Sequence, residues 1–315
     1  MRQIVVGQMG LKVSAMCLGT GGWGTGVKGE GLDRLYETFR EAGGNFFDSA
    51  HCYAFWMPGG EGASERALGA AVRRHGDEGK VVVATKGGHP AALPGYERPE
   101  GYLSPKVIGG DVRESLQRLG MGCVDLYYLH RDDRRVAVGE IMDCLLGEVA
   151  AGRVRNLGAS NWGVDRIAEA NAWAAKKGKA GFVVSQVQWS LAVCAGWGEC
   201  DPVMRTMTAG AVAWHRRTKL PVVAYTSTAG GYFASGGVKG TGFESAVNRA
   251  RLGRAQGLAR KLGVSVNQVA LAWLMGQGFE VVPAVGTGDV GHLVDALGAV
   301  GVGLSAEEVR WLGEG

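Results

Sequence analysis

The sequence lacks the patterns that mark disulfide-stapled and metal-binding proteins. Its six cysteines include no C-x-x-C pair, a spacing typical of zinc and redox sites. Most of them stand within apolar runs, as Cys17 does, and such cysteines are expected to be free, buried thiols. Cys194 and Cys200 form the only pair for which a bridge is plausible. The sequence supports no metal site.

Features of membrane and nucleic-acid-binding proteins are also missing. No window approaches the apolar run that spans a bilayer, and residues 1–7 lack the apolar core of a signal peptide. The 34 basic and 30 acidic residues are spread along the chain without a basic stripe for nucleic acid. We therefore expect a cytoplasmic protein with no membrane or nucleic-acid partner and leave its oligomeric state open. An anionic small ligand suffices to explain the net charge of +4.

The composition is that of a packed protein. Hydrophobic residues make up 46% of the chain and charged residues 20%, which excludes a largely disordered protein. A length of 315 residues exceeds the usual domain size, but α/β barrels run this long as one folding unit. We expect residues 1–315 to form a single domain.

Short apolar runs alternate with longer helical patterns, which predicts parallel strands joined by crossover helices. Eight strands are expected: Ala15–Gly19, Asn45–Ser49, Lys80–Lys86, Val124–His130, Val154–Ser160, Phe182–Gln186, Pro221–Tyr225 and Glu280–Val285. Eight such units favour a closed (β/α)8 TIM barrel over a doubly wound sheet, and no G-x-G-x-x-G motif leads from the first strand into a helix. Helix starts are expected at Ser104-Pro105 and at the capping boxes of residues 265–268 and 305–308.

Polar residues stand at the ends of the expected strands, where a barrel of this kind has its active site. Asp48, Lys86 and His130 end three strands, and Tyr53 follows Asp48 in the loop. A phenol has a pKa of about 10 and donates poorly at neutral pH. A neighbouring lysine ammonium favours the phenolate and so lowers that pKa, while an aspartate holds the lysine charged. Tyr53 could then protonate a carbonyl oxygen.

Taken in order, the segments FFDSAHCY (46–53), VVVATKGG (81–88), DLYYLH (125–130) and NLGASN (156–161) resemble those of the aldo-keto reductases. The likeness runs from Leu11 to about Leu312. It implies a nicotinamide-dependent oxidoreductase that reduces an aldehyde or ketone, or oxidises the alcohol. It also implies a β-hairpin before Ser14 that closes the barrel bottom.

The resemblance assigns the catalytic roles residue by residue. Tyr53 is expected to be the general acid, tuned by Lys86 and Asp48, while His130 positions the substrate carbonyl. Taken singly, each of these residues has an ordinary structural explanation, such as a helix cap for the aspartate. The ordered set is what favours catalysis.

Cofactor contacts are expected at the remaining strand ends. The resemblance implies that Ser160, Asn161 and Gln186 bind a carboxamide and that Tyr225 stacks on the nicotinamide, although a helix cap or core packing are alternatives. The backbone of the stretch after Tyr225 would meet a pyrophosphate. The full expected set of cofactor contacts is Thr20, Asp48, Ser160, Asn161, Gln186, Tyr225, Thr226, Ser227, Thr228, Gly230, Gly231, Gly286, Thr287 and His292.

The segment of residues 282–293 resembles the part of the family that grips the adenosine phosphate, but it has no Arg or Lys. A 2′-phosphate prefers charge-assisted partners, and Asp289 would oppose it. NADP(H) is expected, with NAD(H) left open, and a cation from the stretch Lys239–Arg254 could supply the missing charge.

Aromatic residues are expected to shape the substrate pocket. Trp56 is a candidate lid, and Trp23 and the loop of residues 189–197 are candidate walls. Tryptophans at loop roots also serve as packing anchors, and that alternative stays open. Cys52 is expected to be structural because alternation turns its side chain away from that of Tyr53; redox sensing is the alternative.

Two other functions are compatible with this pattern. One is a nucleotide-binding regulatory subunit with little turnover, like the potassium-channel β subunits. The other is an unrelated barrel enzyme that uses Lys86 as a Schiff-base nucleophile, which would leave Tyr53, Asn161 and Tyr225 unexplained.

Overall fold

Eight parallel strands form a closed barrel in the computed structural model, which describes residues 1–7, 10–91, 95–194, 204–240 and 242–314. Around the barrel the order is β10-β3-β4-β5-β6-β7-β8-β9. These strands are β3 (Cys17–Gly19), β4 (Phe46–Asp48), β5 (Val82–Gly87), β6 (Val124–Leu129), β7 (Val154–Ser160), β8 (Phe182–Gln188), β9 (Val222–Tyr225) and β10 (Val281–Val285). All eight expected strands are present, with ends shifted by at most two residues, and the predicted TIM barrel is confirmed.

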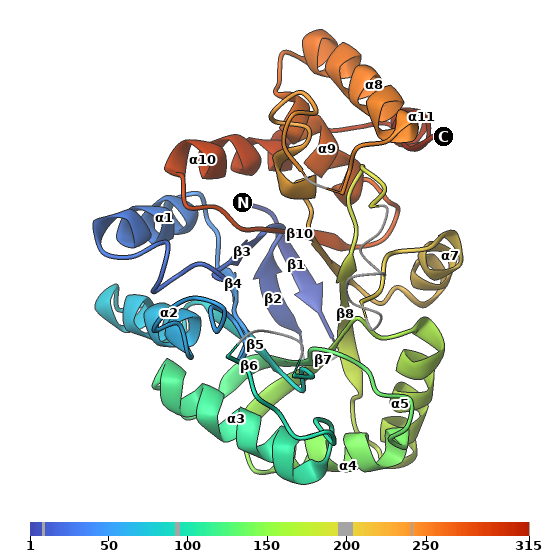
Figure 1. Cartoon of the computed structure of the whole chain (residues 1–315). Helices are drawn as coiled ribbons and strands as arrows, with labels where there is room; N and C mark the ends of the chain where they lie inside the picture. The colour runs from blue at the N-terminus through green and yellow to red at the C-terminus, as the bar shows by residue number, and fades with distance from the viewer. Residues whose placement is uncertain (8–9, 92–94, 195–203, 241, 315) are drawn as a thin grey trace.

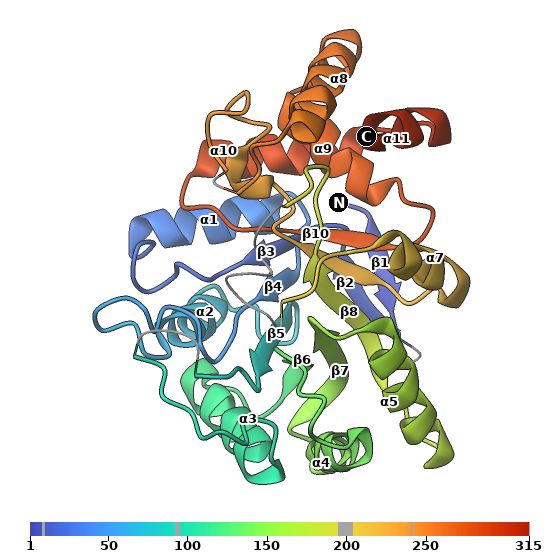
Figure 2. The same ribbon diagram turned by 45° about the vertical axis from the view of Figure 1, so that its right-hand side comes forward.

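Helices surround the strands on the outside of the barrel in both ribbon views (Figures 1 and 2). They are α1 (Glu30–Glu41), α2 (Ala63–Arg74), α3 (Pro105–Leu119), α4 (Val138–Ala150), α5 (Val164–Lys176), α7 (Ala209–Thr218), α8 (Ala246–Leu262), α9 (Val266–Met275), α10 (Val290–Gly298) and α11 (Ala306–Gly313), with 3-10 turns η1 (Ala229–Gly231) and η2 (Ala299–Gly301). Their apolar faces pack on the strands: in α1, Tyr36 and Phe39 are buried against Phe47 of β4.

Local sequence signals account for several helix starts. Both capping boxes are present: Ser265 with Gln268 opens α9, and Ser305 with Glu308 opens α11. α3 begins with a proline in its first turn, as predicted, but the hydroxyl of Ser104 makes no capping hydrogen bond. The fixed φ of proline therefore contributes more to this start than a side-chain cap does.

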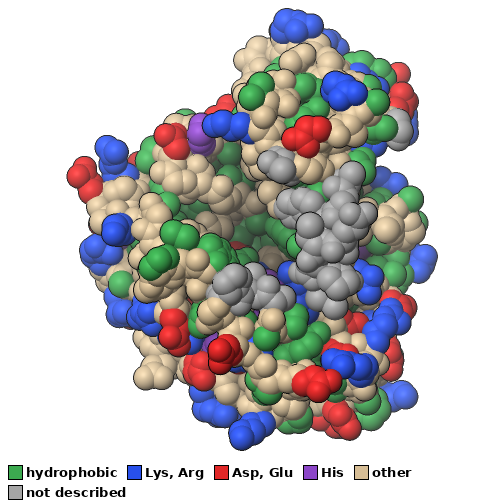
Figure 3. Space-filling model, in the orientation of Figure 1, with side chains coloured by type: hydrophobic (Ala, Val, Ile, Leu, Met, Phe, Trp, Pro, Cys, Tyr) green, Lys and Arg blue, Asp and Glu red, His purple; other side chains and the backbone are tan. Residues whose placement is uncertain are grey.

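A hairpin of β1 (Gln3–Val6) and β2 (Leu11–Ser14) closes one end of the barrel, as predicted. Val6 and Val13 belong to the same buried cluster as the barrel residues Phe46, Val82 and Leu126. The hairpin is visible through the ring of strands in Figure 1. The space-filling view of the same face is hollowed at its centre (Figure 3), so a ligand site belongs at the end opposite the hairpin.

Four cysteines, Cys17, Cys52, Cys123 and Cys144, carry free thiols, and the first two are buried. Cys200 lies outside the described residues, so the alternative of a bridge between Cys194 and Cys200 stays open. Within the described ranges, no helix has the length and apolar character needed to cross a bilayer.

Candidate active site

Lys86 is the centre of a buried polar cluster at the open end of the barrel. Its ammonium donates hydrogen bonds to Asp48 Oδ2 at 2.5 Å, to the carbonyl of Ser49 at 2.7 Å and to the Tyr53 hydroxyl at 3.1 Å. Its side chain is fully buried, and that of Asp48 is 5% exposed. The structure thus brings together three of the four predicted catalytic residues through direct hydrogen bonds.

Strand register and a polar network behind the loop set this geometry. β4 pairs with β5 so that Asp48 lies opposite Ala84, two residues before Lys86. The loop after β4 is held by His51, whose ring nitrogens bond Tyr96 at 3.0 Å and Glu114 at 2.7 Å. This loop places the Tyr53 ring with its centroid 4.5 Å from the Lys86 ammonium.

The charge on Lys86 is held in place by its neighbours. Burial lowers the pKa of the ammonium, but Asp48 and Tyr53 raise it by more, so the net pKa lies above 10.5. Burial raises the pKa of Asp48, and Lys86 lowers it in part. Because a Schiff-base lysine must lose its proton to attack a carbonyl, this environment disfavours Lys86 as a nucleophile.

Lys86 was expected to lower the pKa of Tyr53 below its ordinary value, and the net pKa does not follow that expectation. Lys86 does lower it, but burial of the phenol raises it by more, so the net pKa lies above the ordinary 10.0. Sequence reasoning overlooked this desolvation. Tyr53 therefore keeps its proton at neutral pH and has a cation beside it to stabilise the phenolate once the proton has left.

His130 follows β6 and faces the same tyrosine. The two ring centroids are 5.9 Å apart, in an edge-on arrangement. Burial, Arg131, His89 and Lys86 together lower the pKa of His130 well below 6.5. A neutral imidazole is a hydrogen-bond donor but a weak acid, which suits orienting a carbonyl rather than protonating it.

The expected carboxamide-binding residues lie at the ends of β7 and β8. Asn161 donates to the His130 carbonyl at 3.2 Å and to Ser160 Oγ at 3.1 Å, and its oxygen accepts from the Tyr225 hydroxyl at 2.5 Å. Within the part of the chain that the structure describes, the buried atoms Gln186 Nε2 and Asp48 Oδ1 have no hydrogen-bond partner. The Gln186 amide still lowers the pKa of Asp48, so the two groups are close. Buried polar atoms normally have partners, and a bound amide would supply one.

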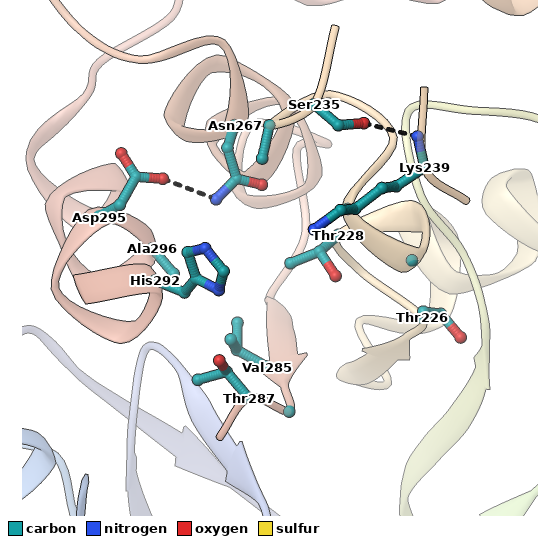
Figure 4. A pocket seen from close by; sticks show the side chains of 14 residues that line it. Thr226, Thr228, Ser235, Lys239, Asn267, Val285, Thr287, His292, Asp295 and Ala296 are labelled. Carbon is teal, nitrogen blue, oxygen red and sulfur yellow. Dashed lines mark hydrogen bonds between the residues drawn. The ribbon is translucent and has the colours of Figure 1, made fainter. Parts of the chain in front are cut away.

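A separate pocket gathers most of the residues expected to bind the pyrophosphate and adenosine (Figure 4). It has a volume of about 460 Å³, which is within the range for small-molecule sites. The expected residues in its lining are Thr226, Thr228, Gly230, Gly231, Gly286, Thr287 and His292. Two segments far apart in the sequence, after β9 and after β10, thus form one cavity.

Some expected contacts lie elsewhere. Thr20 is fully buried and donates to the Asp48 carbonyl at 3.1 Å, so it supports the strand end. Ser227 is 1% exposed and donates to the Ala284 carbonyl at 2.7 Å. Trp23 is 1% exposed and packs edge-on against Phe47, which matches the packing-anchor alternative rather than a pocket wall.

Trp56 is 46% exposed, and its ring lies 6.4 Å from that of Tyr53, which is compatible with a lid or rim. Trp189 is buried against Trp273, in the core. Trp197 lies outside the described residues.

Sequence reasoning missed several pocket residues, and it included Lys239 only as one end of a stretch of candidate cations. Ser235, Lys239, Asn267 and Asp295 also line the cavity, and Figure 4 shows the Lys239 amino group pointing into it near Thr228. The absence of a cation in residues 282–293 was the only signal that pointed to Lys239. Asn267 and Asp295 are joined by a 2.9 Å hydrogen bond between α9 and α10, a pairing with no local sequence signature.

Comparison with known proteins identifies a matching family and similar sequences. The family described as "Aldo/keto reductase family" matches residues 15–314. A norsolorinic acid reductase of Emericella nidulans is 31% identical over 310 residues, covering 95% of this chain and 77% of that protein. An uncharacterized oxidoreductase, YrpG, of Bacillus subtilis is 29% identical and covers 100% of this chain and 95% of its own.

The fold is shared with a solved structure. A thermostable aldo-keto reductase, crystallised with the inhibitor epalrestat, superposes with a TM-score of 0.73 over 99% of both chains, at 22% identity. At this identity the likeness shows the barrel fold alone.

Proposed function

This chain belongs to the aldo/keto reductase family of oxidoreductases, and we propose that it interconverts an aldehyde or ketone and its alcohol with Tyr53 as the proton donor. The observation that carries the proposal is the buried Lys86 ammonium, hydrogen-bonded both to Asp48 and to the Tyr53 hydroxyl. A relative named as a norsolorinic acid reductase supports the direction of reduction. The substrate class is a small carbonyl compound.

In this mechanism the chain's residues handle the proton. The Tyr53 hydroxyl donates its proton to the carbonyl oxygen, and the electron pair of the broken O–H bond stays on the phenolate. The Lys86 ammonium, 3.1 Å away, stabilises that phenolate. Neutral His130 donates a hydrogen bond to the same oxygen and orients it. A reduced nicotinamide, when bound, supplies the hydride for the carbonyl carbon.

The residues present fit a nicotinamide dinucleotide. Gln186 Nε2 is a buried donor lacking a partner in the described ranges, and Ser160 and Asn161 lie beside it at the end of the neighbouring strand. The pocket lined by Thr226, Gly230 and Gly286 would hold the pyrophosphate and adenosine. Tyr225 would stack on the nicotinamide between these two ends.

The first test is turnover by the purified protein. We expect it to shift the fluorescence of a reduced nicotinamide cofactor and to oxidise that cofactor with a reactive aldehyde such as 4-nitrobenzaldehyde. Cofactor binding without turnover across a broad carbonyl panel would favour the regulatory subunit instead. Borohydride trapping of a substrate on Lys86 would favour the Schiff-base enzyme.

The rate of reduction is expected to be nearly independent of pH across the neutral range. The pKa of His130 lies well below 6.5 and that of Tyr53 above 10.0, so neither group changes protonation between about pH 6.5 and about pH 9. Oxidation requires the Tyr53 phenolate and should rise with pH over the same range. Profiles of kcat/KM in both directions test this. A reductive profile that falls steeply across pH 7–8 would contradict the assignment.

We propose that NADP(H) is preferred and that Lys239 provides the cation for its 2′-phosphate. Lys239 lines the pocket with His292. Asp289, expected to repel a phosphate, is instead the N-cap of α10, where it accepts the His292 N–H at 2.8 Å, and it does not line the cavity.

Lys239→Gln is therefore expected to raise the KM for NADPH about tenfold or more, because a charge-assisted hydrogen bond to phosphate is lost. The KM for NADH should change little. Lys12→Gln, at the hairpin end of the barrel, removes the same charge and is the matched control. Equal effects of Lys239→Gln on the KM values for both cofactors would show that Lys239 does not bind the 2′-phosphate.

A further inference from the structure

Three residues that make no hydrogen bond to Lys86 form a second cluster, one of potential metal ligands. Cys52, His89 and His130 follow β4, β5 and β6 respectively, and all are buried. One potential ligand atom from each lies within 4.8 Å of the others. Thiolate sulfur and imidazole nitrogen are the ligand types that divalent zinc and its relatives prefer.

Two contacts already match the geometry of a metal site. The Cys52 sulfur lies 3.4 Å from His130 Nδ1, close to the roughly 3.6 Å separation of sulfur and nitrogen ligands around a tetrahedral zinc ion. His89 Nδ1 lies 2.7 Å from the Pro90 carbonyl, so this nitrogen is the donor and the other ring nitrogen is the one with a lone pair. A backbone carbonyl bonded in this way is the usual outer partner of a metal-binding histidine.

We propose that Cys52, His89 and His130 form an inhibitory site for a zinc-class divalent cation. On binding, the Cys52 thiol loses its proton to solvent and the thiolate coordinates the ion together with the two imidazoles. His130, bound through Nδ1, is then fixed toward the ion and cannot adjust its ring to the substrate carbonyl. The inhibition rests on the proposed function, whereas the binding does not.

The surrounding charges predict a moderate affinity for the ion, lower than that of a structural zinc site. Burial raises the pKa of the Cys52 thiol to about 12, so releasing its proton is costly. Neighbouring Lys86 and Arg131 lower the pKa in part and also repel a cation. The low pKa of His130 keeps that imidazole neutral and able to ligate. Binding should therefore be reversible by a chelator, and Mg²⁺, which prefers oxygen ligands, should not compete.

Direct binding is measured with Co²⁺ as a coloured substitute for zinc, in the full-length protein without cofactor or substrate. We expect a thiolate-to-cobalt absorption band in the near ultraviolet and its displacement by Zn²⁺. Cys52→Ser should abolish the band, and His89→Asn should weaken Zn²⁺ affinity about tenfold or more. Cys144→Ser, which removes a free thiol away from the barrel mouth, is the matched control.

The second arm measures carbonyl reduction with added Zn²⁺ and then with excess chelator. Reversible inhibition that is weakened in His89→Asn supports the site. The proposal is overturned if Co²⁺ gives no thiolate band, or if the band survives Cys52→Ser, whatever the effect of Cys144→Ser. A protein that binds Co²⁺ through Cys52 but reduces no carbonyl would refute the proposed function and leave the metal site intact.

Discussion

Replacing Tyr53 with Phe is expected to lower kcat for carbonyl reduction by about 10²- to 10⁴-fold, the usual contribution of general acid catalysis. The substitution removes only the hydroxyl, which accepts a hydrogen bond from Lys86 at 3.1 Å. His130 cannot substitute as the acid because its pKa lies well below 6.5. Affinity for the reduced cofactor, measured by fluorescence titration, should stay close to that of the wild type.

Tyr128→Phe is the matched control for this experiment. Tyr128 is also fully buried, its ring centroid is 6.0 Å from the Lys86 ammonium, and its hydroxyl has no hydrogen-bond partner among the residues described. Its removal should leave kcat within about twofold of the wild type. If Tyr53→Phe kept the wild-type rate, or if both variants lost activity equally, Tyr53 would not be the proton donor.

The parts of the molecule that could be predicted from sequence are those in which local pattern and barrel geometry agree. A short apolar run in the sequence predicts a buried strand. Because ligands bind at the carboxyl ends of barrel strands, a polar residue that ends such a run is predicted to be a site residue. Asp48, Lys86 and His130 are predicted as site residues in this way. The assignment of Thr226 and His292 to cofactor contacts followed from the family resemblance instead.

The features that sequence could not provide depend on neighbours in space. The pKa of Tyr53 results from desolvation that outweighs a nearby charge, and the extent of burial is not readable from one loop. Trp23 stands at a loop root, and whether it faces a cavity or Phe47 depends on packing. The cluster of Cys52, His89 and His130 shows no metal-binding spacing because three separate strands bring it together.

Lys86→Met is expected to reduce the free energy of unfolding by about 3–5 kcal/mol, because it leaves the Asp48 carboxylate buried without its counter-charge. Adding Asp48→Asn to this variant should recover most of that loss, since the buried charge is then gone. Chemical denaturation of the single and double variants at neutral pH measures both values. Lys177→Met, which breaks an exposed pair with Asp143, should leave the unfolding free energy within error.

The same pair of variants separates the structural role of Lys86 from its proposed catalytic role. The double variant should be stable but should not regain carbonyl reduction, because no cation remains to stabilise the Tyr53 phenolate. The stability deficit of Lys86→Met should also shrink as the pH falls. Without Lys86, the pKa of buried Asp48 rises still further above its unfolded value, so the penalty is full above the folded pKa and disappears once both states are protonated, below about pH 4. A deficit that did not change between neutral and acid pH would mean that Lys86 stabilises the barrel through packing rather than through its charge.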